Sequence, residues 1–135
     1  MAITQNTSAQ SLGDFQWKNR ILLLVDAKPD SEALQSQLSE FTSNRNGLKE
    51  RSLIIFRVTP DAVYAADESP SEMEAKDIYD RYDLALDFSG TILIGKDGGS
   101  KMKKPFEVSA KTVFDLIDSM PMRRAEMRES GRHEG

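Results

Sequence analysis

The sequence predicts an α/β domain with a four-stranded mixed sheet flanked by helices, in the element order β-α-β-α-β-β-α. Three features predict it: short apolar runs at 21–25 and 53–58, helical apolar spacing between them, and a glycine-rich turn at 96–99. Uniformly apolar runs of this length are typical of strands that are buried on both faces of a sheet. The 135 residues suffice for one domain, which we expect to extend over 15–122.

The first strand and helix follow a polar segment, 1–14, that we expect to be flexible. Ile21–Val25 forms the first strand, and Asp30 or Ser31 caps the next helix because their side-chain oxygens accept backbone amide hydrogens. Apolar side chains then recur on one helical face. We expect this helix to end at Asn46–Gly47, since both residue types tolerate a positive φ angle.

The second half of the predicted sheet starts at the apolar run 53–58, which completes a right-handed parallel β-α-β unit. A polar loop is expected at 61–70. Ser71 and Glu74 have the spacing of a capping box, which predicts that a second helix begins there. The third strand is predicted at 91–94.

The C-terminal part is predicted to hold a hairpin and a helix. The 96–99 turn suits a tight hairpin because Asp-Gly and Gly-Gly steps tolerate positive φ angles. It leads into a fourth strand at 100–104, antiparallel to the third, at an edge that its lysines protect. Ser109 caps the last helix and Pro121 stops it. The remainder, 123–135, is predicted to be a charged, partly disordered tail.

Composition excludes several classes of function. Cysteine is absent, so disulfides, thiol redox chemistry, a cysteine nucleophile and thiolate metal sites are excluded. Lys and Arg number 18 against 22 for Asp and Glu, and this net charge of −4 is not that of a dedicated nucleic-acid binder. The single histidine, His133, lies in the predicted tail, which excludes Ser-His and zinc-His sites. We expect no catalytic residue, metal or cofactor.

Localisation stays open between two interpretations. The first 19 residues lack a basic start followed by an apolar run, and the longest apolar stretch has five residues, so no signal peptide or membrane insertion is predicted. Taken literally, the chain is cytoplasmic. A mature exported form, periplasmic or extracellular, with a new Met1-Ala2 start would look the same.

The predicted element order is that of the thioredoxin-like fold. An order of elements by itself implies no activity. Redox proteins of this fold place a cysteine where the first strand leads into the first helix. Here that place is Asp26–Asp30, without a thiol, and Ser89–Thr91 stands where those proteins usually carry a cis-proline. The sequence therefore predicts neither thiol-disulfide exchange nor peroxide reduction.

The chain resembles a known family through several short motifs. They are Trp17 with Asn19-Arg20, Glu50-Arg51, the hairpin 93–99 with Lys101, and Ile117–Arg124 followed by Glu126-Met127. On these motifs it resembles the peroxiredoxin-like, thioredoxin-fold domain of unknown function that occurs in sushi-repeat extracellular proteins and in short stand-alone bacterial proteins. The resemblance implies the fold over roughly 12–128 and supplies no reaction. The residues to which we assign a structural role are Trp17, Arg20, Gly95, Asp97, Gly98, Gly99 and Pro121.

Charge is unevenly distributed along the chain. Nine acids stand against two basic residues at 61–87, whereas five lysines stand against two acids at 96–111. The second region could bind an unknown acidic protein or an anionic ligand; its candidate residues are Lys96, Lys101, Lys103, Lys104, Arg123 and Arg124. In the alternative interpretation, the lysines only protect an edge strand and the acids solvate a helix.

Two structural roles compete with binding for these motifs. Arg123, Arg124 and Glu126 can hold the last helix to the domain through ion pairs, and Asp14, Glu50 and Asp118 are candidate counterparts. Trp17 is expected to pack as a lid on the core, with a guanidinium such as that of Arg20 stacked on it.

The functional expectation is a non-catalytic, cysteine-free interaction module with a thioredoxin-like fold. Two alternatives remain. The first is a cysteine-independent enzyme with an acid/base or metal site at Asp26 beside Lys28. The second is self-association through the fourth strand, giving a weak homodimer.

Overall fold

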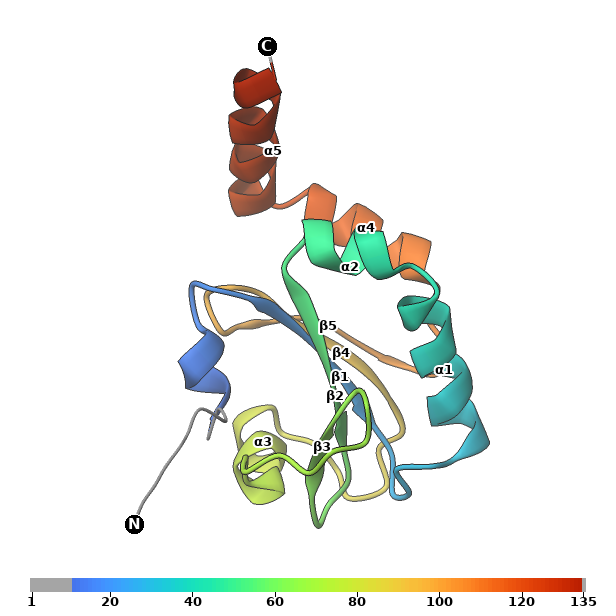
Figure 1. Ribbon diagram of the computed structural model, residues 1–135. Helices are drawn as coiled ribbons and strands as arrows, with labels where there is room; N and C mark the ends of the chain where they lie inside the picture. Colours follow the sequence, from blue (N-terminus) through green and yellow to red (C-terminus); the bar gives the residue numbers. More distant parts are fainter. Residues whose placement is uncertain (1–10, 135) are drawn as a thin grey trace.

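The protein is built on a five-stranded mixed sheet with the strand order β3-β2-β1-β4-β5 (Figure 1). The computed structural model describes residues 11–134. The strands are β1 (Arg20–Val25), β2 (Leu53–Val58), β3 (Val63–Ala65), β4 (Gly90–Ile94) and β5 (Ser100–Pro105). The helices are η1 (Leu12–Phe15), α1 (Glu32–Thr42), α2 (Arg45–Glu50), α3 (Ala75–Arg81), α4 (Ala110–Asp118) and α5 (Pro121–Glu134).

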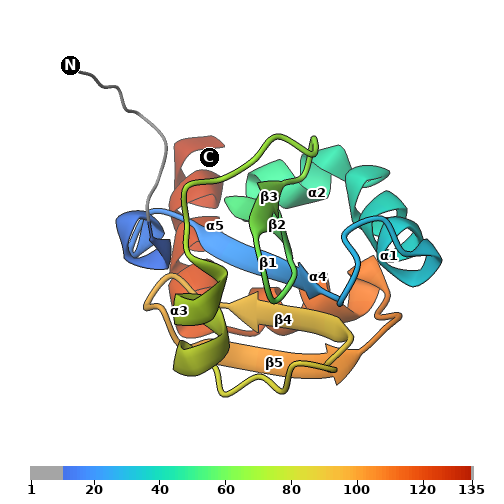
Figure 2. The ribbon, with the colours of Figure 1, turned by 90° about the horizontal axis from the view of Figure 1, so that it is seen from below.

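The sheet topology confirms the predicted α/β, thioredoxin-like fold. β1 pairs in parallel with β2, with Ile21 beside Ile54, and antiparallel with β4. β5 follows β4 as an antiparallel hairpin and forms one edge of the sheet (Figure 2). The prediction of four strands was short by one, because β3 adds a further strand at the opposite edge.

Two hydrophobic cores, one on each face of the sheet, explain why the central strands β1 and β4 are largely apolar. Ile21, Leu23 and Val25 point into the core under η1 and α3, whereas Leu22 and Leu24 point into the core under α1 and α4. Side chains alternate between the faces of a strand, so a strand covered on both faces needs apolar residues at every position.

The predicted loop 61–70 is wrong in part, because it contains β3. Thr59 organises the turn that precedes this strand: its hydroxyl accepts hydrogen bonds from the amides of Asp61 and Ala62 at 3.3 and 3.1 Å. The chain then reverses and β3 pairs antiparallel with β2, with Phe56 opposite Ala65. A strand this short leaves no periodic pattern in the sequence, and its formation depends on the partner strand.

The predicted end of the first helix at Asn46–Gly47 is also wrong. α1 ends at Thr42, and Gly47 lies inside the separate helix α2. The reason is packing: a Cβ atom at Gly47 would lie 2.5 Å from the ring of Phe114 on α4. The glycine is thus required for close approach of α2 to α4, and no helix end is needed to explain it.

Two of the predicted helix caps are confirmed and one is wrong. The hydroxyl of Ser31 accepts a hydrogen bond from the amide of Leu34 at 3.2 Å, and that of Ser109 accepts one from the amide of Thr112 at 3.1 Å. The capping box fails: α3 begins only at Ala75, and the hydroxyl of Ser71 accepts the Met73 amide within the preceding loop. Glu74 is the N-cap residue, but its side chain makes no capping hydrogen bond.

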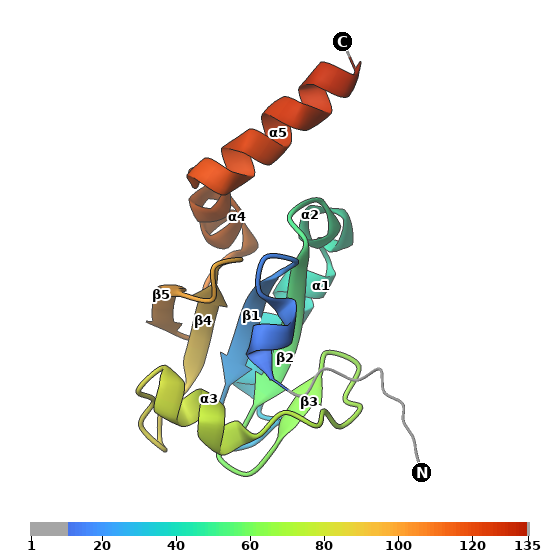
Figure 3. The same cartoon turned by 90° about the vertical axis from the view of Figure 1, so that its left-hand side faces the viewer.

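Both ends of the predicted domain extend further than expected. Residues 1–10 of the predicted lead-in lie outside the described residues, but Leu12 in η1 is buried in the core under α3. At the other end, α5 replaces the predicted disordered tail from residue 123 onward, and it projects away from the sheet (Figures 1 and 3). Of the described helices, none has the length and apolarity to cross a bilayer.

Candidate functional site

In redox proteins of this fold, the thiol lies where the first strand leads into the first helix. We call this place the redox corner, and in this chain a carboxylate with a structural role lies there. Asp26 follows β1, and its Oδ1 accepts the amide of Ala27 at 2.7 Å while its Oδ2 accepts the Ser31 hydroxyl at 2.5 Å. Ser31 in turn caps α1. Both carboxylate oxygens of Asp26 thus hold the loop between β1 and α1 in place.

Of the other polar groups at this corner, Arg57 also serves the loop, whereas the buried hydroxyl of Tyr79 has no hydrogen-bond partner among the described residues. Arg57, buried on β2, donates to the carbonyl of Pro29 at 3.1 Å and to that of Ala66 at 3.3 Å. Burial, followed by the charges of Asp26 and Asp61, raises the pKa of Tyr79, so its hydroxyl stays protonated near neutral pH. Among the side chains that the structure describes, those of residues 11–129, no three Asp, Glu or His are grouped so that they could hold a metal ion.

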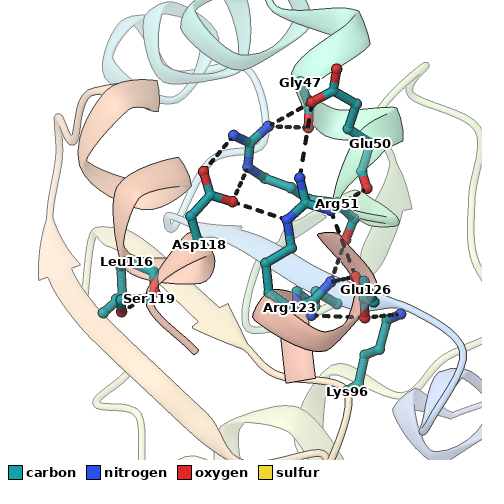
Figure 4. Close-up of polar contacts among 10 residues, drawn as sticks. Gly47, Glu50, Arg51, Lys96, Leu116, Asp118, Ser119, Arg123 and Glu126 are labelled. Carbon is teal, nitrogen blue, oxygen red and sulfur yellow. Dashed lines mark hydrogen bonds and ion pairs between the residues drawn. The ribbon is translucent and has the colours of Figure 1, made fainter. Parts of the chain in front are cut away.

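A second polar cluster lies at the opposite end of β1 and is centred on Glu126 of α5. Arg20 is 1% exposed and donates to both carboxylate oxygens of Glu126, at 3.2 and 3.1 Å. It also donates to the carbonyl of Arg51 at 2.8 Å. Lys96, from the hairpin, donates to Glu126 at 2.7 Å (Figure 4). One carboxylate therefore joins α5 to β1 and to the hairpin.

Asp118, at the end of α4, forms the neighbouring cluster (Figure 4). Arg51 donates to both of its oxygens at 3.1 and 2.8 Å, and Arg123 donates to it at 3.0 Å. Arg51 also lies over the ring of Phe114, 4.3 Å from its centroid. The cluster therefore fixes α2, α4 and α5 relative to one another.

Both central carboxylates are held ionised by these partners. Burial raises the pKa of Glu126, but the hydrogen bonds from Arg20 and Lys96 outweigh it and bring the pKa below its ordinary value of 4.5. Burial likewise raises the pKa of Asp118, and the guanidinium groups of Arg51 and Arg123 bring it below 3.8.

The ion-pair role expected for the C-terminal motif is confirmed for two of its three residues. Arg123 pairs with Asp118 and, at 4.0 Å, with Glu50, while Glu126 pairs with Arg20. Arg124 is exposed and forms no ion pair with any described residue. Asp14 was one expected counterpart, but its carboxylate accepts the amide of Ser11.

The structure divides the six predicted binding residues into two groups. Lys96, Lys101 and Arg123 are paired with carboxylates of the domain; the partner of Lys101 is Asp97, at 2.9 Å. Lys103 and Lys104 of β5 and Arg124 of α5 are exposed, and the part of the chain that the structure describes offers them no carboxylate. The first group has mainly a structural role, and the second leaves positive charge free for a partner.

The hairpin motif forms as predicted. Gly98 has φ 87°, and the amide of Gly95 donates to the carbonyl of Gly99 at 2.9 Å. Hydrogen bonds donated by Lys101 and by the Gly99 amide to the carboxylate of Asp97 lower the pKa of this group. The turn is also fastened to the C-terminal end of α3, because the hydroxyl of Tyr82, the residue after this helix, donates to the carbonyl of Gly98 at 3.0 Å.

The prediction that Trp17 is a lid on the core is wrong. The side chain is 63% exposed. Its backbone has φ 70°, and its amide donates to the carbonyl of Lys96 at 2.6 Å. The backbone of Trp17 is therefore part of the contact between the hairpin and the segment before β1, while the indole faces solvent.

A groove of about 260 Å³ opens between the hairpin and the junction of α4 and α5. One side consists of Met120, Pro121 and Met122, and the other of Lys96 and Lys101 with their neighbours. Pro121 is the first residue of α5, where a missing amide hydrogen costs nothing. The sequence contains the Met-Pro-Met motif, but only the meeting of hairpin and helices creates the groove.

The two edges of the sheet differ in how they are covered. At β3, the following loop folds back, with the amide of Ala65 donating to Ser69 and the amide of Ser71 donating to Val63. At β5, by contrast, none of the described residues pairs with the outer side of the strand. The sheet thus has one covered edge and one open edge, and the open one carries the free lysines.

Fold and site together define a thioredoxin-like domain whose redox corner contains no thiol. The chain belongs to the DUF4174 family, a domain of unknown function, whose sequence profile matches residues 11–126. It is similar to Coiled-coil domain-containing protein 80 of Danio rerio, with 26% identity over 133 residues. That match covers 86% of this chain but only 15% of the length of the relative.

Solved structures show the same fold at low sequence identity. The reduced 2-Cys peroxiredoxin of Plasmodium vivax has a TM-score of 0.64 and 14% identity, with 84% of each chain covered. Mycobacterium tuberculosis AhpC has a TM-score of 0.53 and 11% identity, with 79% of this chain and 76% of that chain covered. Because this chain has no cysteine, it shares the peroxiredoxin-like fold without the thiol.

Proposed function

We propose that this protein is a non-catalytic thioredoxin-like interaction domain that binds an acidic protein through its basic edge. The basic edge is β5 with Lys101, Lys103 and Lys104. The observation that carries the proposal is the location of the free positive charge. Lys103 and Lys104 are exposed without a carboxylate partner among residues 11–129, whose side chains the structure describes, and they lie on the open edge of the sheet.

The corner at Asp26 offers less support for an enzyme. Both oxygens of Asp26 are engaged by the loop, and Lys28 beside it is exposed. A general base needs a free lone pair aimed at the substrate, and a metal site needs further ligands. The non-catalytic interpretation is therefore the one that we adopt.

Self-association through β5 is also less favoured. Two copies paired edge to edge would bring two sets of Lys101, Lys103 and Lys104 against each other, and like charges on adjacent strands are destabilising. An acidic partner meets the same edge with attraction. The same lysines that disfavour pairing with a second copy thus select a partner of opposite charge.

The experiment is a fluorescence titration of the protein with labelled poly-L-glutamate, with poly-L-lysine as the probe of opposite charge. Lys103→Glu/Lys104→Glu is compared with Lys28→Glu/Lys49→Glu, which makes the same change in net charge at exposed sites away from β5. We expect the β5 variant to weaken binding of poly-L-glutamate by roughly tenfold more than the control variant does. Equal weakening by the two variants, or no binding by the wild type, would contradict the proposal.

A further inference from the structure

We infer that the acidic partner binds as an extended segment that adds a strand to β5 and places an apolar side chain in the groove beside Met120 and Met122. This inference rests on the proposed function, because it specifies how the same basic edge is used. It names the class of partner: an acidic segment in extended conformation with one apolar residue at one end. Its occupant is a different protein from this one.

The two edges of the sheet differ in whether their outer backbone groups are already paired. An edge strand presents a row of backbone donors and acceptors, and an added strand pairs with them. The edge at β3 is closed by the loop that follows it, through the bonds from Ala65 to Ser69 and from Ser71 to Val63. β5 is the edge that keeps its outer row free of the described residues.

The exposed side chains along β5 are mainly positively charged. Met102 is buried, whereas Lys101, Lys103 and Lys104 are exposed. Consecutive residues of a strand point to opposite faces, so Lys103 and Lys104 offer positive charge on both faces of the sheet edge. A strand laid beside β5 therefore meets positive charge on each face, which favours glutamate or aspartate in the segment.

A groove lies at the hairpin end of β5. Lys101 belongs to both features, since it is on β5 and lines the groove of about 260 Å³. The groove offers the flexible thioether side chains of Met120 and Met122, and Met122 is 41% exposed. Methionine adapts to different apolar shapes, so an apolar side chain at the end of the segment can be buried there.

Charge also decides between a foreign segment and a segment of this chain. Residues 1–10 contain no Asp or Glu, so they lack the charge that would complement β5. A second copy paired edge to edge would present its own lysine-rich β5. Its acidic region at 61–87 is already folded into α3 and the loop that closes β3, so it offers no free extended segment. We therefore assign the acidic segment to a different protein.

The test uses short labelled peptides that repeat Glu-Glu-Val, so that glutamates fall on both faces of the added strand. Each peptide has a leucine at one end or at the other, and fluorescence anisotropy is the readout. Two control peptides carry backbone N-methyl groups, one at the odd and one at the even residues, with unchanged charge and side chains. A further control replaces the leucine by serine. Amide chemical shifts of the ¹⁵N-labelled protein locate the bound peptide.

We expect N-methylation at one set of alternate residues to weaken binding by about tenfold, because it removes backbone donors of the added strand. The leucine-to-serine change should weaken binding to the wild type but have much less effect on a Met122→Asp variant. Amide shifts should concentrate on Lys101–Lys104 and spare Asp26–Ser31.

Two negative results separate the two proposals. If the acidic peptides bind but tolerate N-methylation and leave the β5 amides unshifted, strand addition is wrong while the basic interaction surface stands. If neither the peptides nor poly-L-glutamate binds, the proposed function is wrong, and this inference is wrong with it.

Discussion

At the scale of single residues, the most demanding interaction is the pair formed by Arg20 and Glu126. The guanidinium of Arg20 is 1% exposed, so water cannot replace a lost partner. Without the carboxylate of Glu126, a buried positive charge would be left unpaired, which destabilises the folded state. Lys96 adds a third charged group to the same site. The family motif at the C-terminus is thus explained by stability, because Glu126 fastens α5 to β1.

The first prediction concerns this pair. Glu126→Gln keeps the shape of the side chain but leaves Arg20 and Lys96 without their counter-charge, and we expect the free energy of unfolding to fall by about 2 kcal/mol. Urea denaturation measures it. Asp80→Asn, which breaks an exposed pair with Lys76, is the control and should have a much smaller effect. Equal losses would show that the buried pair has no special weight.

The second prediction concerns pH. Glu126 and Asp118 have folded-state pKa values below 4.5 and 3.8, so the unfolded chain binds more protons in acid than the folded one does. Their contribution to stability is complete above these ordinary values and is lost as the pH falls through the lowered ones. The urea midpoint should therefore drop with acidification, and less steeply in Glu126→Gln and Asp118→Asn. Parallel curves for wild type and variants would contradict this assignment.

At the scale of elements, the contact between α2 and α4 shows how packing overrides a local signal. Gly47 has the position of a helix end in the sequence, yet it lies within α2 because Phe114 occupies the space of its missing side chain. The same ring also contacts the guanidinium of Arg51, 4.3 Å from the ring centroid. Nothing local to Gly47 signals this packing, which forms between residues distant in the chain.

The third prediction tests this contact. In an isolated helix, Gly→Ala stabilises by about 1 kcal/mol, but Gly47→Ala should destabilise by about 1–2 kcal/mol because the Phe114 ring must move. Thermal or urea unfolding reports the change. Gly13→Ala is a suitable control, since the nearest atom to its added methyl group would be the Ser11 hydroxyl oxygen, at 3.5 Å. Stabilisation by Gly47→Ala would contradict the packing explanation.

Elements with a local pattern could be predicted from the sequence, and those that depend on partners could not. β1 and β2 carry continuous apolar runs, and the 95–99 turn carries its glycines. β3 depends on pairing with β2, and α5 depends on the ion pairs of Arg123 and Glu126. The lysines of the candidate site were also visible in the sequence, but which of them carry free charge depends on Asp97 and Glu126.

At the scale of the whole molecule, the two ends of β1 have different roles. One end leads to Asp26, where the fold's redox proteins carry a thiol and this chain carries a loop held by hydrogen bonds. The other end leads to Arg20, which together with Glu126 attaches α5 beside the hairpin. The groove at this second end adjoins β5, so the candidate interaction surface lies on the hairpin side and away from the redox corner.

The fourth prediction concerns the charge of this surface. Binding of poly-L-glutamate should weaken steeply as salt is raised, since exposed charges separated by about 10 Å are largely screened at about 0.1 M salt. Titrations at several salt concentrations measure the slope. Lys103→Glu/Lys104→Glu should flatten it, whereas Lys28→Glu/Lys49→Glu should leave it close to that of the wild type. An unchanged slope in the β5 variant would show that the charge recognised lies elsewhere.

The most direct test of the central claim is hydrogen–deuterium exchange of the protein with and without the acidic peptide. If the peptide adds a strand to β5, exchange slows at the β5 amides and stays unchanged in the loop of Asp26–Ser31. Slower exchange at that loop, with β5 unaffected, would show that the peptide binds at the redox corner instead.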